Sequence, residues 1–130
     1  MMTYHKEATR TTPGIDLDMD SGFVKLFGRS SPENSVQFYA PLLDALRTPN
    51  PNLTRLEMDF RLEYFNTSSS KCLYDIFKLL KRIETEGIEL SINWYYEPMD
   101  EDMFEAGEDF SELLDLEFNF IEQEDVADYN

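Results

Sequence analysis

The chain of 130 residues contains only one cysteine and one histidine. The lone Cys72 forms no internal disulfide, and the N-terminus lacks the apolar stretch of a secretory signal peptide, so we expect a cytoplasmic protein. No apolar run approaches the roughly 20 residues that a membrane-spanning helix needs. The sequence therefore predicts a soluble chain that does not insert into a membrane.

Positive charge is also scarce, with 11 Lys and Arg against 27 Asp and Glu and a formal net charge of −16. Such a chain repels the phosphates of nucleic acids and anionic lipid surfaces, so neither is an expected partner. The acidity does not indicate disorder, because 42% of the residues are hydrophobic and 14% are aromatic. That is enough apolar material for a packed core, and the length fits one compact domain.

The chain divides into three parts. Residues 1–14 show no apolar periodicity and end in Pro13 and Gly14, which predicts a flexible N-terminal segment. We expect a single α/β domain over residues 15–121. From residue 122 to residue 130 the sequence predicts an acidic C-terminal tail.

Strands are predicted where apolar and polar residues alternate. The clearest run covers residues 56–64, and shorter runs cover residues 88–95 and 116–120. Residues 15–27 predict a β-hairpin that turns at residues 20–22, where Asp, Ser and Gly supply turn chemistry.

Helices are predicted where apolar residues recur every three or four positions. One covers residues 33–47 and is expected to be capped by Ser30 or Ser31. A second covers about residues 69–86, and a third, acidic helix is expected within residues 100–114.

The resulting order, ββαβαβαβ, predicts a mixed sheet of about five strands in which helices serve as crossovers. Because most strands alternate, the helices should lie mainly on one face while the other, acidic face meets water. We therefore expect a two-layer α/β sandwich. The side chains expected on the open face include Asp16, Asp59, Glu63 and Glu89. The expected core includes Leu56, Met58, Phe60, Leu62, Ile76, Leu80, Ile88, Leu90 and Ile92.

Two acidic stretches carry carboxylates of the kind that bind metals or act as acid and base. Residues 16–22 lack the spacing of a calcium loop, and residues 100–109 have no histidine or phosphate-binding loop beside them. His5 lies in the N-terminal segment, and Cys72 has no histidine to activate it, which favours a buried structural thiol. We therefore expect solvated surfaces, no metal or cofactor, and no enzymatic activity.

A polar hinge, residues 66–71, joins the clearest strand to the second helix. A side-chain oxygen there can cap the helix by accepting from free N–H groups of the first turn. Four consecutive hydroxyl residues at a helix N-terminus also suit a phosphorylation switch, because the free N–H groups and the helix dipole favour an added phosphate. The residues alone leave both roles open.

The hinge carries a family resemblance. Residues 62–71, LEYFNTSSSK, resemble the signature of the SiaC family of bacterial regulatory phosphoproteins. Residues 28–34 (GRSSPEN), 94–96 (WYY) and 105–109 (EAGED) resemble further landmarks of that family in the same order. Together the matches span about residues 15–120, which is essentially the whole predicted domain.

The resemblance implies partner switching controlled by phosphorylation. A protein kinase of the GHKL type would phosphorylate Thr67 and a PP2C-type phosphatase would reverse the reaction. The unphosphorylated form would bind an output protein such as a diguanylate cyclase, in biofilm or c-di-GMP signalling. Ser31 stands where a tyrosine is frequent in the family. The partner-binding residues expected around Thr67 are Tyr64, Phe65, Asn66, Ser68, Ser69, Ser70 and Lys71.

Two other functions compete with this interpretation. One is an enzyme that uses the acidic residues 100–109, although a nucleophile, a base and a pocket signature are missing from the sequence. The other is an interaction module without phosphorylation, whose acidic sheet face binds a basic partner.

Overall fold

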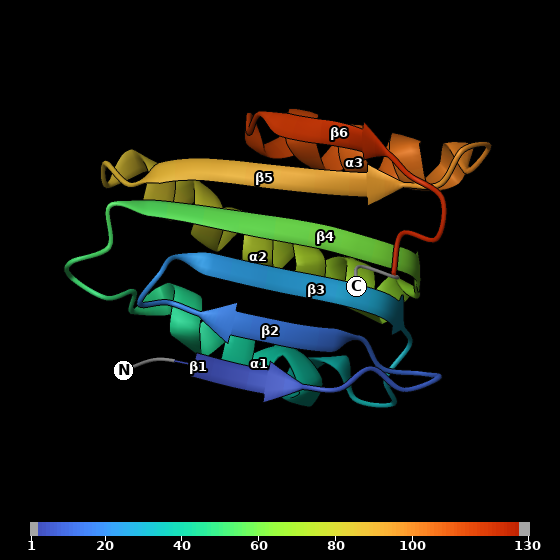
Figure 1. Ribbon diagram of the computed structural model, residues 1–130, viewed down its shortest axis with the longest axis horizontal. Helices are drawn as coiled ribbons and strands as arrows, with labels where there is room; N and C mark the ends of the chain where they lie inside the picture. Colours follow the sequence, from blue (N-terminus) through green and yellow to red (C-terminus); the bar gives the residue numbers. More distant parts are fainter. Residues whose placement is uncertain (1–2, 128–130) are drawn as a thin grey trace.

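A computed structural model describes residues 3–127, which form one open six-stranded sheet with its helices on one face (Figure 1). The strands lie in sequence order, antiparallel from β1 to β3 and parallel from β3 to β6. The predicted mixed α/β class with helices on one face is confirmed, with one strand more than expected. In chain order the elements are β1 (Thr3–Lys6), β2 (Gly14–Asp18), β3 (Phe23–Ser30), α1 (Ser35–Arg47), β4 (Arg55–Phe65), α2 (Thr67–Thr85), β5 (Glu89–Tyr96), α3 (Glu101–Leu114) and β6 (Phe118–Glu122).

The extra strand is β1, which lies within the segment predicted to be flexible. It pairs antiparallel with β2, from Thr3 opposite Asp18 to Lys6 opposite Ile15. The prediction of a flexible segment is therefore wrong for residues 3–6. A four-residue edge strand with mostly exposed side chains shows too little alternation to be recognised, and its pairing with β2 is not a local property.

Helix starts also differ from the prediction. The cap of α1 is Asn34, whose Oδ1 accepts from the N–H of Gln37 at 3.1 Å, rather than Ser30 or Ser31. Ser30 is instead the last residue of β3 and is fully buried. The capping rule favours Asn as much as Ser, so the rule holds and the position shifts.

None of the helices in residues 3–127 has the length and apolar composition of a membrane span.

An aromatic cluster forms the part of the core beneath α2 and α3. Trp94 of β5 stacks near Phe118 at 5.9 Å between ring centroids, and its Nε1 donates to the carbonyl of Met103 at 2.9 Å. Gly107 of α3 faces the same ring, where a Cβ atom would lie 2.6 Å from Trp94. Only glycine at this position lets α3 approach the sheet so closely.

Most of the predicted core is confirmed. The buried members are Leu56, Met58, Phe60, Leu62, Ile76, Leu80 and Ile92. Ile88 and Leu90 are only half-buried. Ile88 directly precedes β5 and Leu90 is its second residue, and β6 does not yet pair there, because the β5–β6 ladder begins at Ile92. This end of β5 is therefore an edge, and burial there is incomplete.

The open face, which carries no helix, is acidic as predicted only in part. Glu63 and Glu89 are exposed and Asp16 is half-buried, but Asp59 is buried. Asp59 accepts from Nδ2 of Asn93 on the neighbouring strand at 2.8 Å. The hydrogen bond compensates for the burial of this carboxylate. Alternation alone does not predict that burial, although the strand position does face away from the helices.

The predicted acidic tail also differs from expectation. Glu122 is the last residue of β6, and the chain then turns back across β5 towards β4 (Figure 1). Nη1 of Arg61 donates to Oε1 of Gln123 at 3.3 Å and to the carbonyl of Val126 at 3.4 Å, and Val126 is buried. A cation on β4 therefore fastens the segment that follows β6. Residues 128–130 lie outside the described residues.

Candidate functional site

Thr67 is the first residue of α2 and its side chain is exposed. Asn66 caps the helix, because its Oδ1 accepts from the N–H of Ser69 at 2.8 Å. The N–H of Asn66 itself donates to the carbonyl of Ser30 at 2.9 Å, which ties the helix start to the end of β3. The cap is thus an amide rather than one of the four hydroxyls, and the Thr67 hydroxyl is presented on a fixed backbone.

The four consecutive hydroxyl residues occupy different environments. Thr67 and Ser68 are exposed, Ser70 is half-buried, and Ser69 is fully buried. Ser68 Oγ lies 2.7 Å from Ser35 Oγ, so one hydrogen bond joins the first turns of α1 and α2. An enzyme that modifies a side chain must reach it, which leaves Thr67 and Ser68 as the accessible hydroxyls of the hinge.

A buried chain of hydroxyl groups anchors the hinge from below. Ser69 Oγ lies 2.7 Å from Ser30 Oγ and donates to the Ser30 carbonyl at 3.1 Å. Ser30 Oγ lies 2.6 Å from the hydroxyl of Tyr39, on α1. Burial raises the pKa of the Tyr39 phenol far above its ordinary value, so this group stays neutral. Sequence reasoning missed the support from Ser30 and Tyr39, because they lie 39 and 30 positions from Ser69 and no local pattern links them.

Replacing Ser69 with Ala should destabilise the fold, because Ser30 would lose a buried hydrogen-bond partner. We expect the free energy of unfolding to fall by about 1–3 kcal/mol in urea denaturation. Thr67→Ala is the matched control, since its hydroxyl is exposed, and should change stability by less than about 0.5 kcal/mol. Equal losses in the two variants would refute the anchoring role.

The other predicted partner-binding residues surround Thr67 without forming one cluster. Tyr64 is exposed near the end of β4, and the guanidinium of Arg29 lies 5.0 Å from its ring centroid. Phe65 is half-buried against the aromatic cluster, 6.3 Å from Phe110. Lys71 is exposed, with Nζ 3.0 Å from Oδ2 of Asp75 one turn further along α2.

Two shallow hollows are lined by residues that lie close to Thr67 in the chain. The α1–α2 hollow, about 410 Å³, lies between the helix starts and is lined in part by Ser35, Val36, Ser68 and Lys71. The β4–α3 hollow, about 290 Å³, is lined in part by Glu63, Tyr64, Phe65, Asp100 and Met103. Phe65 lines one hollow and Ser68 the other, so Thr67 stands in the chain between them.

The acidic stretch at residues 100–109 belongs to α3. Asp100 is its cap, with Oδ1 accepting from the N–H of Met103 at 3.0 Å. Glu101, Asp102 and Glu105 are exposed, and acidic side chains near a helix start interact favourably with the helix dipole. Within residues 3–127, no three His, Cys, Asp or Glu side chains converge as metal ligands do.

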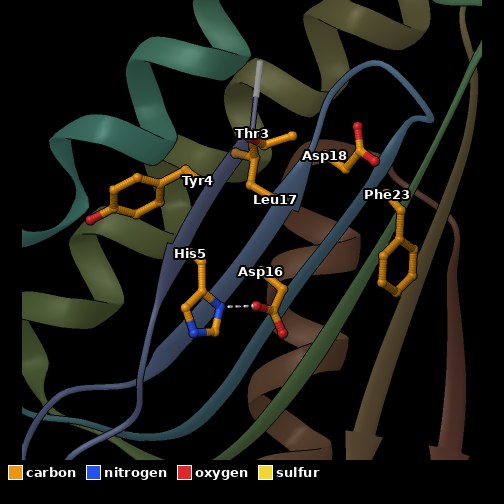
Figure 2. Close-up of a pocket in the computed structure, with 7 residues that line it drawn as sticks. All are labelled: Thr3, Tyr4, His5, Asp16, Leu17, Asp18 and Phe23. Carbon is orange, nitrogen blue, oxygen red and sulfur yellow. Dashed lines mark hydrogen bonds and ion pairs between the residues drawn. The ribbon is translucent and has the colours of Figure 1, made fainter. Parts of the chain in front are cut away.

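Cys72 and His5 lie on different elements of the fold, α2 and β1. Cys72 is buried on α2, as predicted, and burial raises the pKa of its thiol. His5 lies on β1 and its Nδ1 contacts Oδ1 of Asp16 beside a hollow of about 240 Å³ (Figure 2). That hollow also borders Phe23, the first residue of β3, whereas the hinge is tied to Ser30, the last. It therefore lies at the opposite end of the strand from Thr67.

Comparisons with known proteins agree with this arrangement. The chain matches the SiaC family regulatory phosphoprotein model over residues 6–123. An uncharacterised protein of Pseudomonas aeruginosa strain UCBPP-PA14 is 36% identical over 124 residues, covering 95% of this chain and 97% of that protein.

Two solved structures are also similar. SiaC of P. aeruginosa is 34% identical with a TM-score of 0.81, covering 95% of this chain and 98% of that chain. The crystal structure of the diguanylate cyclase SiaD in complex with its activator SiaC, from the same organism, contains a chain that is 32% identical with a TM-score of 0.85. That match covers 92% of this chain and 99% of the other. The chain therefore belongs to the SiaC family of regulatory phosphoproteins.

Proposed function

We propose that this chain is a phosphorylation-controlled switch whose phosphoacceptor is Thr67. A GHKL-type kinase adds the phosphate and a PP2C-type phosphatase removes it. The observation that carries the proposal is the exposed Thr67 hydroxyl at the start of α2, on a backbone held by the Asn66 cap and by Ser30. A kinase needs an accessible hydroxyl, and the neighbouring Ser69 is buried.

The output partner we propose is a diguanylate cyclase of the SiaD type, bound by the unphosphorylated form. The support is the similar P. aeruginosa SiaC, which is described as the activator of SiaD in their complex. In this role the chain acts through binding and has no catalytic activity of its own. Its acidic residues on α3 are exposed and serve the helix start and the surface rather than a reaction.

The helix start suits an added phosphate. The first four N–H groups of a helix, counted from the cap, have no partner within it. Here the N–H of Asn66 donates to Ser30 and that of Ser69 donates to the Asn66 side chain. The N–H groups of Thr67 and Ser68 are those that a phosphate on Thr67 would meet. Lys71 would either neutralise part of its charge or contact the kinase.

Phosphorylation would act on the partner through charge and bulk. A phosphate adds about −1.5 to −2 charge and three acceptor oxygens at one point. If a partner covers the α2 start, that charge must lose its water without gaining a compensating charge from the partner, which is strongly unfavourable. The partner would leave without any refolding of this domain, because the hinge is already anchored by the buried hydroxyl chain.

The test of the acceptor is phosphate incorporation with the GHKL-type kinase and ATP, followed by intact-mass spectrometry. The wild-type chain should gain one phosphate, Thr67→Ala should gain none, and Ser68→Ala should gain one. Ser68 is the control because it is the other exposed hydroxyl of the hinge. A phosphate that persists in Thr67→Ala and disappears in Ser68→Ala would move the switch to Ser68, and none in any protein would favour the non-phosphorylated acidic interaction module.

A further inference from the structure

Met99 stands out in two independent ways. The residue is 95% exposed, more than any other large apolar residue in residues 3–127. Its backbone φ is +74°, a left-handed conformation that glycine and asparagine adopt readily and in which most other residues are strained. Both features are unfavourable in an isolated domain, and such strain gathers at functional sites.

The strain has a local origin in the turn between β5 and α3. The N–H of Asp100 donates to the carbonyl of Glu97 at 3.0 Å, and Pro98 and Met99 occupy the two central positions. With proline first and a positive φ second, this is a type II turn, whose third residue is usually glycine. Methionine here places an apolar side chain at the tip of the turn, where glycine would place nothing.

Met99 lies at the same edge of the sheet as Thr67. The helices α1, α2 and α3 follow the neighbouring parallel strands β3, β4 and β5, so their starts lie along one edge in that order. Val36, another exposed apolar side chain, is in the first turn of α1. Asp100 borders both the β4–α3 hollow and a third hollow of about 290 Å³ that Met99 lines, so the surface is continuous from Tyr64 to Met99.

The charge around Met99 has one sign. Carboxylates line both hollows, and no Lys, Arg or His of residues 3–127 is among the lining residues. These carboxylates are Glu63, Asp100, Glu101, Asp102 and Glu122. A partner that fits has a cationic surface around an apolar recess, because complementary charge steers association and a buried apolar anchor supplies affinity.

We propose that Met99 is the apolar anchor of a docking surface for the cyclase, which presents an apolar recess within a cationic surface. This inference rests on the proposed function, because it takes the output partner from there. It adds Met99, with Val36 beyond Thr67, to the contacts expected from the hinge. The surface thus extends on both sides of the phosphoacceptor, so one phosphate lies within the covered area. The cations of the partner pair with the carboxylates of the two hollows, neither of which Thr67 lines, so the phosphate gains no cation there.

The test measures binding of the full chain, unphosphorylated, to SiaD of P. aeruginosa by calorimetry at two salt concentrations. Met99→Gly and Met99→Asn remove the anchor while keeping a residue that accepts the left-handed backbone. Each should weaken binding about 10- to 30-fold, as truncation of an interface anchor does. The melting temperature of each variant should equal that of the wild type or exceed it by up to about 4 °C, because backbone strain is relieved. Higher salt should weaken wild-type binding.

Leu113→Ala is the matched control. Leu113 is also exposed, at 67%, but it lies in the last turn of α3, at the other end of the helix from Met99. The affinity of Leu113→Ala for SiaD should stay within about twofold of the wild-type affinity. P. aeruginosa SiaC serves as the positive control for the SiaD preparation.

The outcomes separate the two proposals. If the wild type binds SiaD and both Met99 variants bind equally well, the docking surface is refuted and the proposed function stands. An equal loss in Leu113→Ala also refutes it, since the effect would not be specific to this edge. If the wild type does not bind SiaD while P. aeruginosa SiaC does, the proposed output partner fails, and the docking surface fails with it. If the Met99 variants lower only the rate of Thr67 phosphorylation, the surface belongs to the kinase and not to the cyclase.

Discussion

Phosphorylation of Thr67 is expected to weaken binding of the chain to a SiaD-type diguanylate cyclase by at least about a hundredfold. Leaving a charge unpaired in a buried contact costs about 3–5 kcal/mol, and a hundredfold change in affinity corresponds to about 2.7 kcal/mol. Thr67 is exposed, and Phe65 and Ser68, close to it in the chain, line the two hollows, so a partner docked there would cover the phosphate. Enzymatically phosphorylated chain and untreated chain should be compared by calorimetry, together with the activity of the cyclase.

The control for this experiment is Thr67→Ala treated with the same kinase and ATP. It should bind the cyclase as the untreated wild type does, because the cap that holds the helix start is Asn66 and remains in place. Thr67→Asp is a weaker probe, since one carboxylate has less charge and fewer acceptor oxygens than a phosphate. Equal affinity of the phosphorylated and unphosphorylated chains would contradict the switch.

The sequence predicts most of the fold because its strands and helices are strongly periodic. Residues 56–64 alternate through all of β4 except its first and last residues, and the apolar stripe of residues 69–86 matches the buried face of α2. One buried face per element produces these patterns, so they survive without any knowledge of neighbours. The parallel order from β3 to β6 then follows from the alternation of strands and helices.

Three of the predictions that fail concern contacts between segments that are distant in the sequence. Asp59 is buried, and its hydrogen-bond donor Asn93 lies 34 positions later. The segment after β6 is held by Arg61, which lies 62 positions before Gln123. β1 owes its strand to pairing with β2. None of these contacts leaves a periodic signal, so a local pattern assigns the residues to solvent, tail or flexible segment.

The sequence indicates where the candidate site lies, but not which residues support it. The hinge and its family resemblance indicate Thr67, and the exposed side chain at the helix start agrees with that placement. The buried support from Ser30 and Tyr39 is invisible in the sequence, because those residues lie on other elements. Sequence reasoning also missed Met99, although a proline followed by a non-glycine residue in a turn could have drawn attention to it.

Truncating Phe60 to Ala should cause the largest loss of stability, about 3–5 kcal/mol in the free energy of unfolding. Phe60 is 1% exposed on the central strand β4, with its ring centroid 4.8 Å from that of Phe77 and 5.6 Å from that of Trp94. Removing the ring loses its transfer free energy and leaves a cavity between β4 and α2. Two large aromatic neighbours cannot collapse into that space without leaving their own contacts, which places the cost in the upper part of the usual range.

The measurement is urea denaturation followed by the fluorescence of Trp94, the single tryptophan of the chain. Leu113→Ala is the control, because it removes a side chain that is already exposed and should change stability by less than about 0.5 kcal/mol. Both transitions should keep the wild-type slope, so that the shift in midpoint reports stability alone. A loss below about 1 kcal/mol in Phe60→Ala would mean that the ring does not fill the space between β4 and α2, and the burial assigned to this strand would be wrong.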